Sequence, residues 1–467
     1  MSITSTNAQY DAALARWARN RAALAGQDAV KEAGHLFLPD DSYEDKSKDG
    51  RSRYARYLAR ATWMPITGYS HTGLIGMIFR LPPTLEMPPI LEYTLENADG
   101  CGQSLTRLAA SVCSELLIVG RAGILVDYPR LDGVPDSETE QSLGLGARLK
   151  LYLAENIDHW AFDFQNGKKR LTMVKLREVV TETSDDFVDS SAMRYRVLRL
   201  QDGVYTQTLH NDKGEILDGP IIPLMAGGVP FDHIPFQFIG AHNNSEAIDV
   251  APLSGIVDLN VSHYQMSADS AKNLHIHSGG LMVISSDMDT EQWIAANPNG
   301  VTVGADQGVF VGPGGSATLL QLESASAVEE KIKRLENQML SVGAHLITDK
   351  GDNETAEAAR IDASSKAASL LRTTDNASEA IEAALEDAAL FMAADPNTVM
   401  FKLNRDFYPD SLAAQDVMAL IQLQDRGNIA ALDVRSKLRR AGWIAPERTD
   451  ELIDESALPA ELIAPGA

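Results

Sequence analysis

The chain has 467 residues, several times the length of a typical domain, so we expect two or more cooperating units with ample core. Its formal net charge of −24 argues against a protein that grips nucleic acid by neutralising phosphates, because that mode needs a clustered basic surface. The same acidity suits a ring or channel that repels phosphates and lets DNA slide, although simple solubility is the commoner reason for such a charge.

Hydropathy gives no sign of a membrane protein. No window approaches the roughly 18 to 20 uninterrupted apolar residues of a membrane span, and residues 1 to 6 lack the basic-then-apolar order of a signal peptide. We therefore expect a cytosolic product without a membrane partner. Cys101 and Cys113 lie twelve positions apart, which is neither a zinc spacing nor a disulfide framework, so we expect incidental or buried thiols.

Helical patterns dominate the N-terminal part of the chain. Residues 7 to 33 carry an apolar side typical of one helix. A second helix is predicted from residue 51 toward residue 69, with a kink or break at Pro65. A third is predicted over residues 104 to 119, where Gly120 supplies the C-terminal stop.

Strand patterns follow. Residues 122 to 129 form a short apolar run ended by proline, which is typical of a buried strand. From about residue 149 to 240 the character becomes β, with a turn predicted at Asp202-Gly203. The clearest strands cover residues 171 to 182, 195 to 200 and 204 to 209. We therefore expect a β-rich lobe inserted among helices.

The region from residue 252 to 395 alternates helices with a small β segment. The predicted elements are a helix over 253–271, short strands and glycine turns over 275–322, a helix over 325–347, a polar loop over 348–353 and a long helix over 354–395. A strand over 399–403 and helices over 410–426 and 432–441 complete the chain. Together these elements predict an α+β fold, mainly α.

The helix over 325–347 carries the most informative pattern. Its large apolar residues recur at spacings of 4, 3, 4, 3 and 4, which predicts one stripe that packs against neighbouring helices. The stripe consists of Val328, Ile332, Leu335, Met339, Val342 and Leu346. Taken alone, the pattern favours an ordinary helical hairpin inside one globule.

Several local patterns invite a chemical interpretation, and a structural one is favoured for each. His275-x-His277 on a strand could present two metal ligands, but no third ligand lies nearby. Residues 97 to 102 favour an Asx turn over a calcium loop, and residues 312 to 316 a turn over a phosphate cradle. The basic set Arg435, Lys437, Arg439 and Arg440 could belong to a helix-turn-helix, against the acidic balance. We expect no catalytic residue, no metal and no cofactor, although dispersed catalytic residues stay open.

Five segments, in order along the chain, resemble portal proteins of tailed bacteriophages, specifically a compact subgroup. They are Arg53-Tyr54-x-x-Tyr57-Leu58-Ala59-Arg60-Ala61, residues 73–83, Leu117-x-x-Gly120-Arg121-Ala122-Gly123-Ile124-Leu125-Val126-Asp127-Tyr128-Pro129, residues 253–269 and residues 354–362. Each motif is modestly specific, and the resemblance covers nearly the whole chain. It implies the portal fold of wing, stem, clip and crown.

The resemblance also implies a division of the chain. It gives a wing over residues 1–250 with the β lobe, about 149–240, inside it; stem helices over 251–273 and 325–347; a clip over 274–324; a tunnel loop over 348–353; a long spine helix and wing strand over 354–408; and a short crown over 409–467. The tunnel loop, which would face DNA, consists of Thr348, Asp349, Lys350, Gly351, Asp352 and Asn353. Lys350 could touch phosphates or pair with a neighbouring aspartate.

The expected function follows from the resemblance. Portal proteins form rings, typically of about twelve subunits, at one capsid vertex of the virion after assembly in the host bacterial cytoplasm. The implied partners are other copies of the chain, terminase, the major capsid or scaffold protein, neck or tail adaptor proteins, and double-stranded viral DNA that passes without sequence-specific binding. Another oligomeric virion adaptor ring, or a soluble enzyme with dispersed catalytic residues, are the alternatives.

Overall fold

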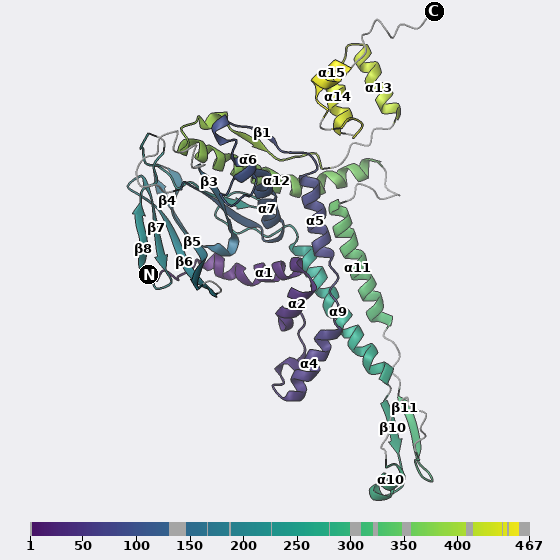
Figure 1. Cartoon of the computed structure of the whole chain (residues 1–467). Coiled ribbons are helices and arrows are strands. Elements are labelled where there is room, and N and C mark those ends of the chain that lie inside the picture. The colour runs from purple at the N-terminus through teal and green to yellow at the C-terminus, as the bar shows by residue number, and fades with distance from the viewer. Residues whose placement is uncertain are drawn as a thin grey trace, which may run out of the picture. The chain divides into compact units, whose positions relative to one another are not determined.

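The computed structural model is shown in Figure 1. The described residues are 2–129, 146–165, 167–185, 188–225, 227–279, 281–298, 310–320, 326–347, 356–407, 414–440, 442–445 and 448–456. They divide into two compact units, Met1–Leu403 and Asn404–Ala467. Long helices and antiparallel sheets make up the larger unit, which confirms the prediction of an α+β fold, mainly α.

Helices form the N-terminal part of the larger unit. The long ones are α1 (Ala8–Ala25), α2 (Gln27–Ala33), α4 (Lys48–Arg60), α5 (Ile66–Ile78) and α7 (Leu105–Ile118), and the short ones are η1 (Gly34–Leu36), α3 (Asp41–Glu44), η2 (Pro89–Leu91) and α6 (Thr94–Asn97). The single helix expected over residues 7 to 33 is interrupted at Gly26, whose φ of 97° lies outside the helical range. The predicted break at Pro65 is confirmed, because α5 begins at the next residue.

The predicted β lobe belongs to two sheets rather than one. A three-stranded antiparallel sheet has β2 (Arg121–Asp127) at its centre, between β3 (Arg148–Leu153) and β9 (Phe236–Gly240). A five-stranded antiparallel sheet runs in chain order through β4 (Ile157–Gln165), β5 (Lys168–Asp185), β6 (Val188–Gln201), β7 (Val204–Asn211) and β8 (Ile216–Ile221), after the turn η3 (Ala154–Asn156). The two ends of the lobe therefore return to a strand that precedes it in sequence. The predicted turn is present, with positive φ at Asp202 and Gly203.

Three long helices follow the lobe. They are α9 (Ser254–Gly279), α11 (Ser326–Ile347) and α12 (Ala356–Phe391), and between α9 and α11 lie the antiparallel strands β10 (Leu281–Ser285) and β11 (Ser316–Leu320) with the short helix α10 (Thr290–Ala296). The first helix was expected to end near residue 271, and α9 continues to Gly279. The turn η4 (Pro396–Thr398) leads to β12 (Met400–Lys402), which pairs with β1 (Thr84–Glu86).

The core of the larger unit lies where helices cover the three-stranded sheet. α12 packs against β2 and β9 and against α7 (Figure 1). Fully buried side chains from several elements meet there, including Leu116, Ile124, Ile239 and Leu385. Burial of such side chains stabilises the fold by about 1.5–3 kcal/mol each relative to an exposed position. The three-stranded sheet and α12 therefore form the packed core of the larger unit.

The smaller unit is helical. Its described elements are α13 (Ala414–Asp425), α14 (Ala431–Arg440) and α15 (Asp450–Ser456), of which only α15 was not predicted. In α14, Arg435 pairs with Asp454 at 2.5 Å and Arg439 pairs with Asp450 at 2.7 Å. Two cations of the basic set found in the sequence are thus matched by acids of α15, which weakens the helix-turn-helix interpretation.

Candidate functional site

The predicted apolar stripe lies on α11, which packs against α9 and α5 (Figure 1). Leu335 and Met339, one helical turn apart, are buried with exposed fractions of 8% and 0%. Val328 and Ile332 are half-buried. The side chains of Val342 and Leu346 lie outside the described part of the chain. The structure therefore brings at least the central residues of the stripe into one helix–helix contact.

Polar contacts accompany this apolar packing. Asn260 of α9 is buried and donates from Nδ2 to Thr67 Oγ1 of α5 at 3.1 Å. His263 of α9 lies 3.4 Å from Glu336 of α11, between Nε2 and Oε1. Because buried polar groups need partners of defined geometry, such contacts fix the register of α9 against its two neighbours.

The first turn of α9 is held by the core. The amide of Leu253 donates to the carbonyl of Leu117 at 3.1 Å. Asn20 of α1 is fully buried and donates from Nδ2 to the carbonyl of Ile118 and to Ser254 Oγ. The helix pair α9 and α11 is therefore not an independent hairpin, since its start is hydrogen-bonded to the ends of α7 and to α1.

The outer face of α11 is charged with both signs. Among the residues of α11 whose side chains are described, Glu329, Glu330, Lys331, Lys333, Arg334, Asn337 and Gln338 are exposed. Alternating charges of this kind are typical of helices that meet other helices through ion pairs. They are less suited to a phosphate backbone, which would be repelled by the two glutamates.

The predicted tunnel loop, Thr348 to Asn353, lies outside the described residues. That this loop faces DNA, and that Lys350 contacts phosphates, therefore stays a prediction. What the structure does describe are the two helices that flank it, α11 before the loop and α12 after it.

A second polar cluster ties the segment before β9 to α12. His233 Nε2 lies 2.8 Å from Asp387 Oδ1 of α12, and Gln237 Nε2 donates to Asp387 Oδ2 at 3.2 Å. Asp232 lies 2.9 Å from the other ring nitrogen of His233, and Arg170 flanks Asp232. The hydrogen bond to Asp387 raises the pKa of His233 to about 9, against the effect of burial, so the imidazole is protonated near neutral pH.

Raising the pH is expected to weaken this tie. Because the pKa of His233 is raised on folding, its contribution is fully present below pH 6.5 and is lost as pH rises through about 9. The His233 side chain is 39% exposed, so solvent screening reduces the effect to about 1 kcal/mol of unfolding free energy. Denaturant unfolding at pH 6.5 and pH 9.5 measures it. Asp387→Asn should remove most of this pH dependence, and an unchanged difference in that variant would contradict the assignment.

Several sites considered from the sequence are placed elsewhere by the structure. His275 and His277 lie within α9, not on a strand, and positions two apart on a helix do not share a face. The hypothesis of two ligands on one strand face is therefore wrong. Among the described residues no group of three His, Cys, Asp or Glu is placed to hold a metal. None of the described helices combines the length and apolarity that a membrane span needs.

Two smaller predictions are confirmed. In the segment over residues 97 to 102, Asp99 accepts from the amide of Cys101 at 2.7 Å, so it forms an Asx turn ahead of α7. Cys113 is buried, and burial raises the pKa of its thiol to about 12, whereas Cys101 is exposed. The two cysteines therefore do not form a common site.

Comparison with protein families gives one match. The family described as "Domain of unknown function (DUF4055)" matches residues 252–392, well under half of the chain. The match begins two residues before α9 and ends one residue after α12, so it covers the helix pair, the strands between and the long helix. No curated protein matches the sequence.

Several solved structures are similar to the chain. A chain of the native gene transfer agent virion has 13% identity and a TM-score of 0.38, covering 80% of this chain and 88% of that one. A chain from the neck of the native particle, computed with C12 symmetry, has 13% identity and a TM-score of 0.38, covering 80% and 89%. An HK97 family phage portal protein from Corynebacterium diphtheriae has 11% identity and a TM-score of 0.33, covering 77% and 97%. Similarities of this size do not by themselves assign a function.

One charged feature was missed by the sequence interpretation. α4 contains five basic residues and one acidic residue among its 13 positions, in a chain where acids exceed bases by 24. The average over the whole chain hid this local excess. A window of helical length would have found it.

Proposed function

We propose that this chain is the subunit of a portal ring that sits at one vertex of a viral capsid and conducts double-stranded DNA. In this proposal α9 and α11 form the stem, and the segment between them forms the clip that docks terminase or neck proteins. The loop between α11 and α12 faces the channel, α12 is the spine, and the unit from Asn404 is a short crown. The protein acts as a conduit and docking platform rather than as an enzyme.

The observation that carries the proposal is the meeting of the portal-like sequence segments around α9. Tyr57, in the first segment, donates to Asp269, in the fourth, at 2.5 Å. Leu117, which opens the third segment, accepts from Leu253, which opens the fourth, at 3.1 Å. The second segment spans the end of α5, which packs against α9 and α11. Segments far apart in sequence thus support one helix, as expected if all of them belong to one architecture.

Charge supports the same proposal. The net charge of −24 suits a wall along which phosphates slide without being held. The outer face of α11, with acids and bases interspersed, suits contact with neighbouring copies around a ring. A closed ring needs such heterologous contacts, in which one face of each subunit meets a different face of the next.

Electron microscopy of the purified protein, with two-dimensional class averages and a mass measurement in solution, tests the proposal. We expect rotationally symmetric rings with an axial hole wide enough for duplex DNA. Closed dimers, or monomers at every protein concentration and with candidate partners added, would contradict it. Rings without an axial channel would favour a virion adaptor of another kind.

A further inference from the structure

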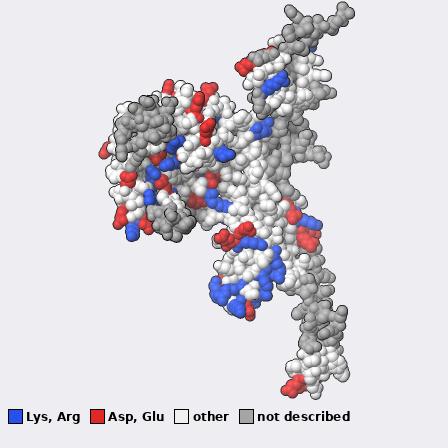
Figure 2. Space-filling view, viewed as in Figure 1, with Lys and Arg blue, Asp and Glu red and all other residues white. Residues whose placement is uncertain are grey.

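The exposed side of α4 is the main basic surface visible in Figure 2, where Lys and Arg side chains gather over this helix. We call it the α4 basic face, and it consists of Lys48, Arg51, Arg53, Arg56 and Arg60. Four of these side chains are exposed, and Arg60 is half-buried. The face is a local exception in a strongly acidic chain.

Most cations of the α4 basic face lack an acidic partner. Arg53 pairs with Asp45 at 2.6 Å. Within the described part of the chain, Lys48, Arg51, Arg56 and Arg60 make no ion pair, and Arg60 donates only to the carbonyl of Arg56 at 3.3 Å. In contrast, Arg21 of α1 is matched by Glu115 at 2.7 Å and by Glu155 at 2.5 Å.

Unpaired like charges on one helix face oppose folding. Arg56 and Arg60 stand four positions apart, and Arg53 and Arg56 stand three apart, so each pair shares a face of α4 and repels. Asp40, Asp41 and Asp45 lie close by, but of these only Asp45 pairs with a cation of α4 among the described residues. Binding of an anionic partner would remove this repulsion between the arginines, which explains why they stand together on α4.

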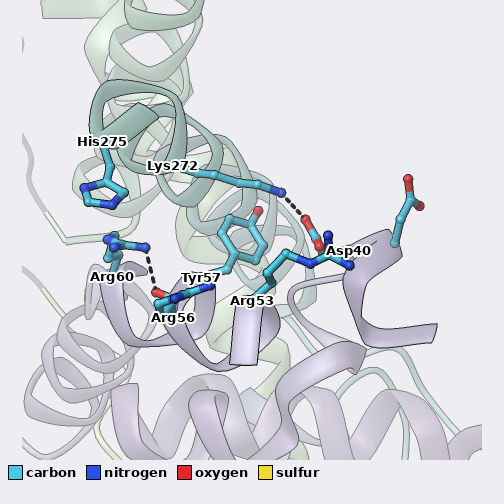
Figure 3. Close-up of a pocket in the computed structure, with 8 residues that line it drawn as sticks. Asp40, Arg53, Arg56, Tyr57, Arg60, Lys272 and His275 are labelled. Atoms are coloured by element: carbon cyan, nitrogen blue, oxygen red, sulfur yellow. Dashed lines mark hydrogen bonds and ion pairs between the residues drawn. The ribbon is translucent and has the colours of Figure 1, made fainter. Parts of the chain in front are cut away.

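The α4 basic face borders a pocket of about 520 Å³ between α4 and α9 (Figure 3). Arg53, Arg56 and Arg60 line it from α4, and Lys272 and His275 line it from α9. The walls are fixed, because Tyr57 donates to Asp269 and Lys272 pairs with Asp40 at 2.5 Å. Asp40 and Asp41 close one side, which leaves the arginine side for an anion.

The shape of the face favours a phosphate backbone over an acidic protein. Arg53 and Arg60 are seven residues apart on one side of α4, which is about 10.5 Å along the helix axis. That length equals about three times the roughly 3.4 Å rise per phosphate of one DNA strand along the duplex axis. Guanidinium groups bind phosphate oxygens in a bidentate manner. No large apolar side chain of α4 is exposed, whereas protein interfaces have an apolar core.

We propose that the α4 basic face binds the phosphate backbone of double-stranded DNA without reading its sequence. The inference rests on the proposed function, which places this chain beside DNA. It assigns the subunit a DNA contact outside the predicted tunnel loop. It also refines the expectation from net charge, because a chain that is acidic overall still carries one clustered basic surface.

Fluorescence anisotropy tests the inference, with a labelled duplex of about 30 base pairs and arbitrary sequence, at salt concentrations from about 50 to 200 mM. The variant is Arg53→Gln, Arg56→Gln and Arg60→Gln together, since these three share one side of α4 and glutamine keeps helix propensity. Each lost phosphate contact should lower the salt slope by about 0.9, so the triple variant should lower it by about 2.7. Affinity at low salt should fall about 10-fold or more.

A matched triple variant controls for charge. Lys168→Gln, Arg199→Gln and Lys213→Gln together remove three exposed cations from the five-stranded sheet and its β7–β8 turn, and this variant is expected to leave affinity and slope unchanged. Equal losses in both variants, no DNA binding by the natural chain at 50 mM salt, or equal competition by polyglutamate at matched charge would each overturn the inference.

Ring formation is scored separately for every variant by electron microscopy. Rings that fail to bind DNA through α4 would refute this inference and leave the proposed portal function standing. DNA binding through α4 by a chain that forms no ring at any protein concentration, even with candidate partners added, would refute the portal function instead. Circular dichroism of the triple variant, expected to match the natural chain, confirms that a loss of binding does not reflect a loss of α4.

Discussion

Met339→Asp is expected to lower the free energy of unfolding by about 3–5 kcal/mol and to abolish ring assembly. The Met339 side chain is fully buried where α11 packs against α9 and α5. The substitution removes an apolar side chain worth about 1.5–3 kcal/mol of burial and places a carboxylate there without a partner. Denaturant unfolding monitored by circular dichroism gives the stability, and electron microscopy gives the assembly.

Gln338→Asp is the matched control. It introduces the same charge one position earlier on α11, at a side chain that is exposed. We expect a change of stability within about 0.5 kcal/mol and normal rings. If Met339→Asp behaved like this control, α11 would not be packed as the structure has it. If both variants lost rings but only Met339→Asp lost stability, the exposed face of α11 would be the subunit contact.

Periodicity explains which elements could be predicted. The α11 stripe repeats every three to four residues, so its helix was expected to span 325–347 and is observed over Ser326–Ile347. The helix ending at Gly120 was equally clear, because an apolar face stops at a glycine with a φ of 85°. Both signals are local, and local signals are what a single sequence carries.

Long-range pairing could not be predicted in the same way. β2 pairs with β9, more than a hundred residues later in the chain. The sequence around each strand contains no signal that identifies the strand with which it pairs. The β lobe was therefore expected as one body, although its first and last strands belong to the sheet around β2. The end of α9 was placed too early because no glycine or proline stops the helix before Gly279.

In the candidate site too, local features could be predicted from the sequence and long-range contacts could not. Leu335 and Met339 could be found from spacing, because burial on a helix follows its period. The contacts of Tyr57 with Asp269, and of Lys272 with Asp40, join α4 and the segment before it to α9, and only the fold brings them together. The pocket beside the α4 basic face exists because of those contacts, so its position had no signal in the sequence.

Gly120→Ala is expected to lower the free energy of unfolding by about 2–4 kcal/mol and to loosen the start of α9. Gly120 has a φ of 85°, which an L-residue rarely adopts. A Cβ atom there would lie 2.9 Å from the carbonyl oxygen of Asp249 and 3.0 Å from the amide nitrogen of Ala251. Both neighbours are backbone atoms, so neither can rotate away, and the segment that leads into α9 must shift.

Gly102→Ala separates the two causes. Gly102 has a similar φ of 90°, but a Cβ atom there would have no other atom within 4 Å. This variant should therefore show only the backbone strain, about 1 kcal/mol, in the same denaturant titration. The excess cost at Gly120 measures the close approach of the chain before α9. Equal losses of unfolding free energy at the two glycines would mean that the chain before α9 can move away from a Cβ atom at position 120. The start of α9 would then be held by the hydrogen bond from Leu253 to Leu117 rather than by close packing.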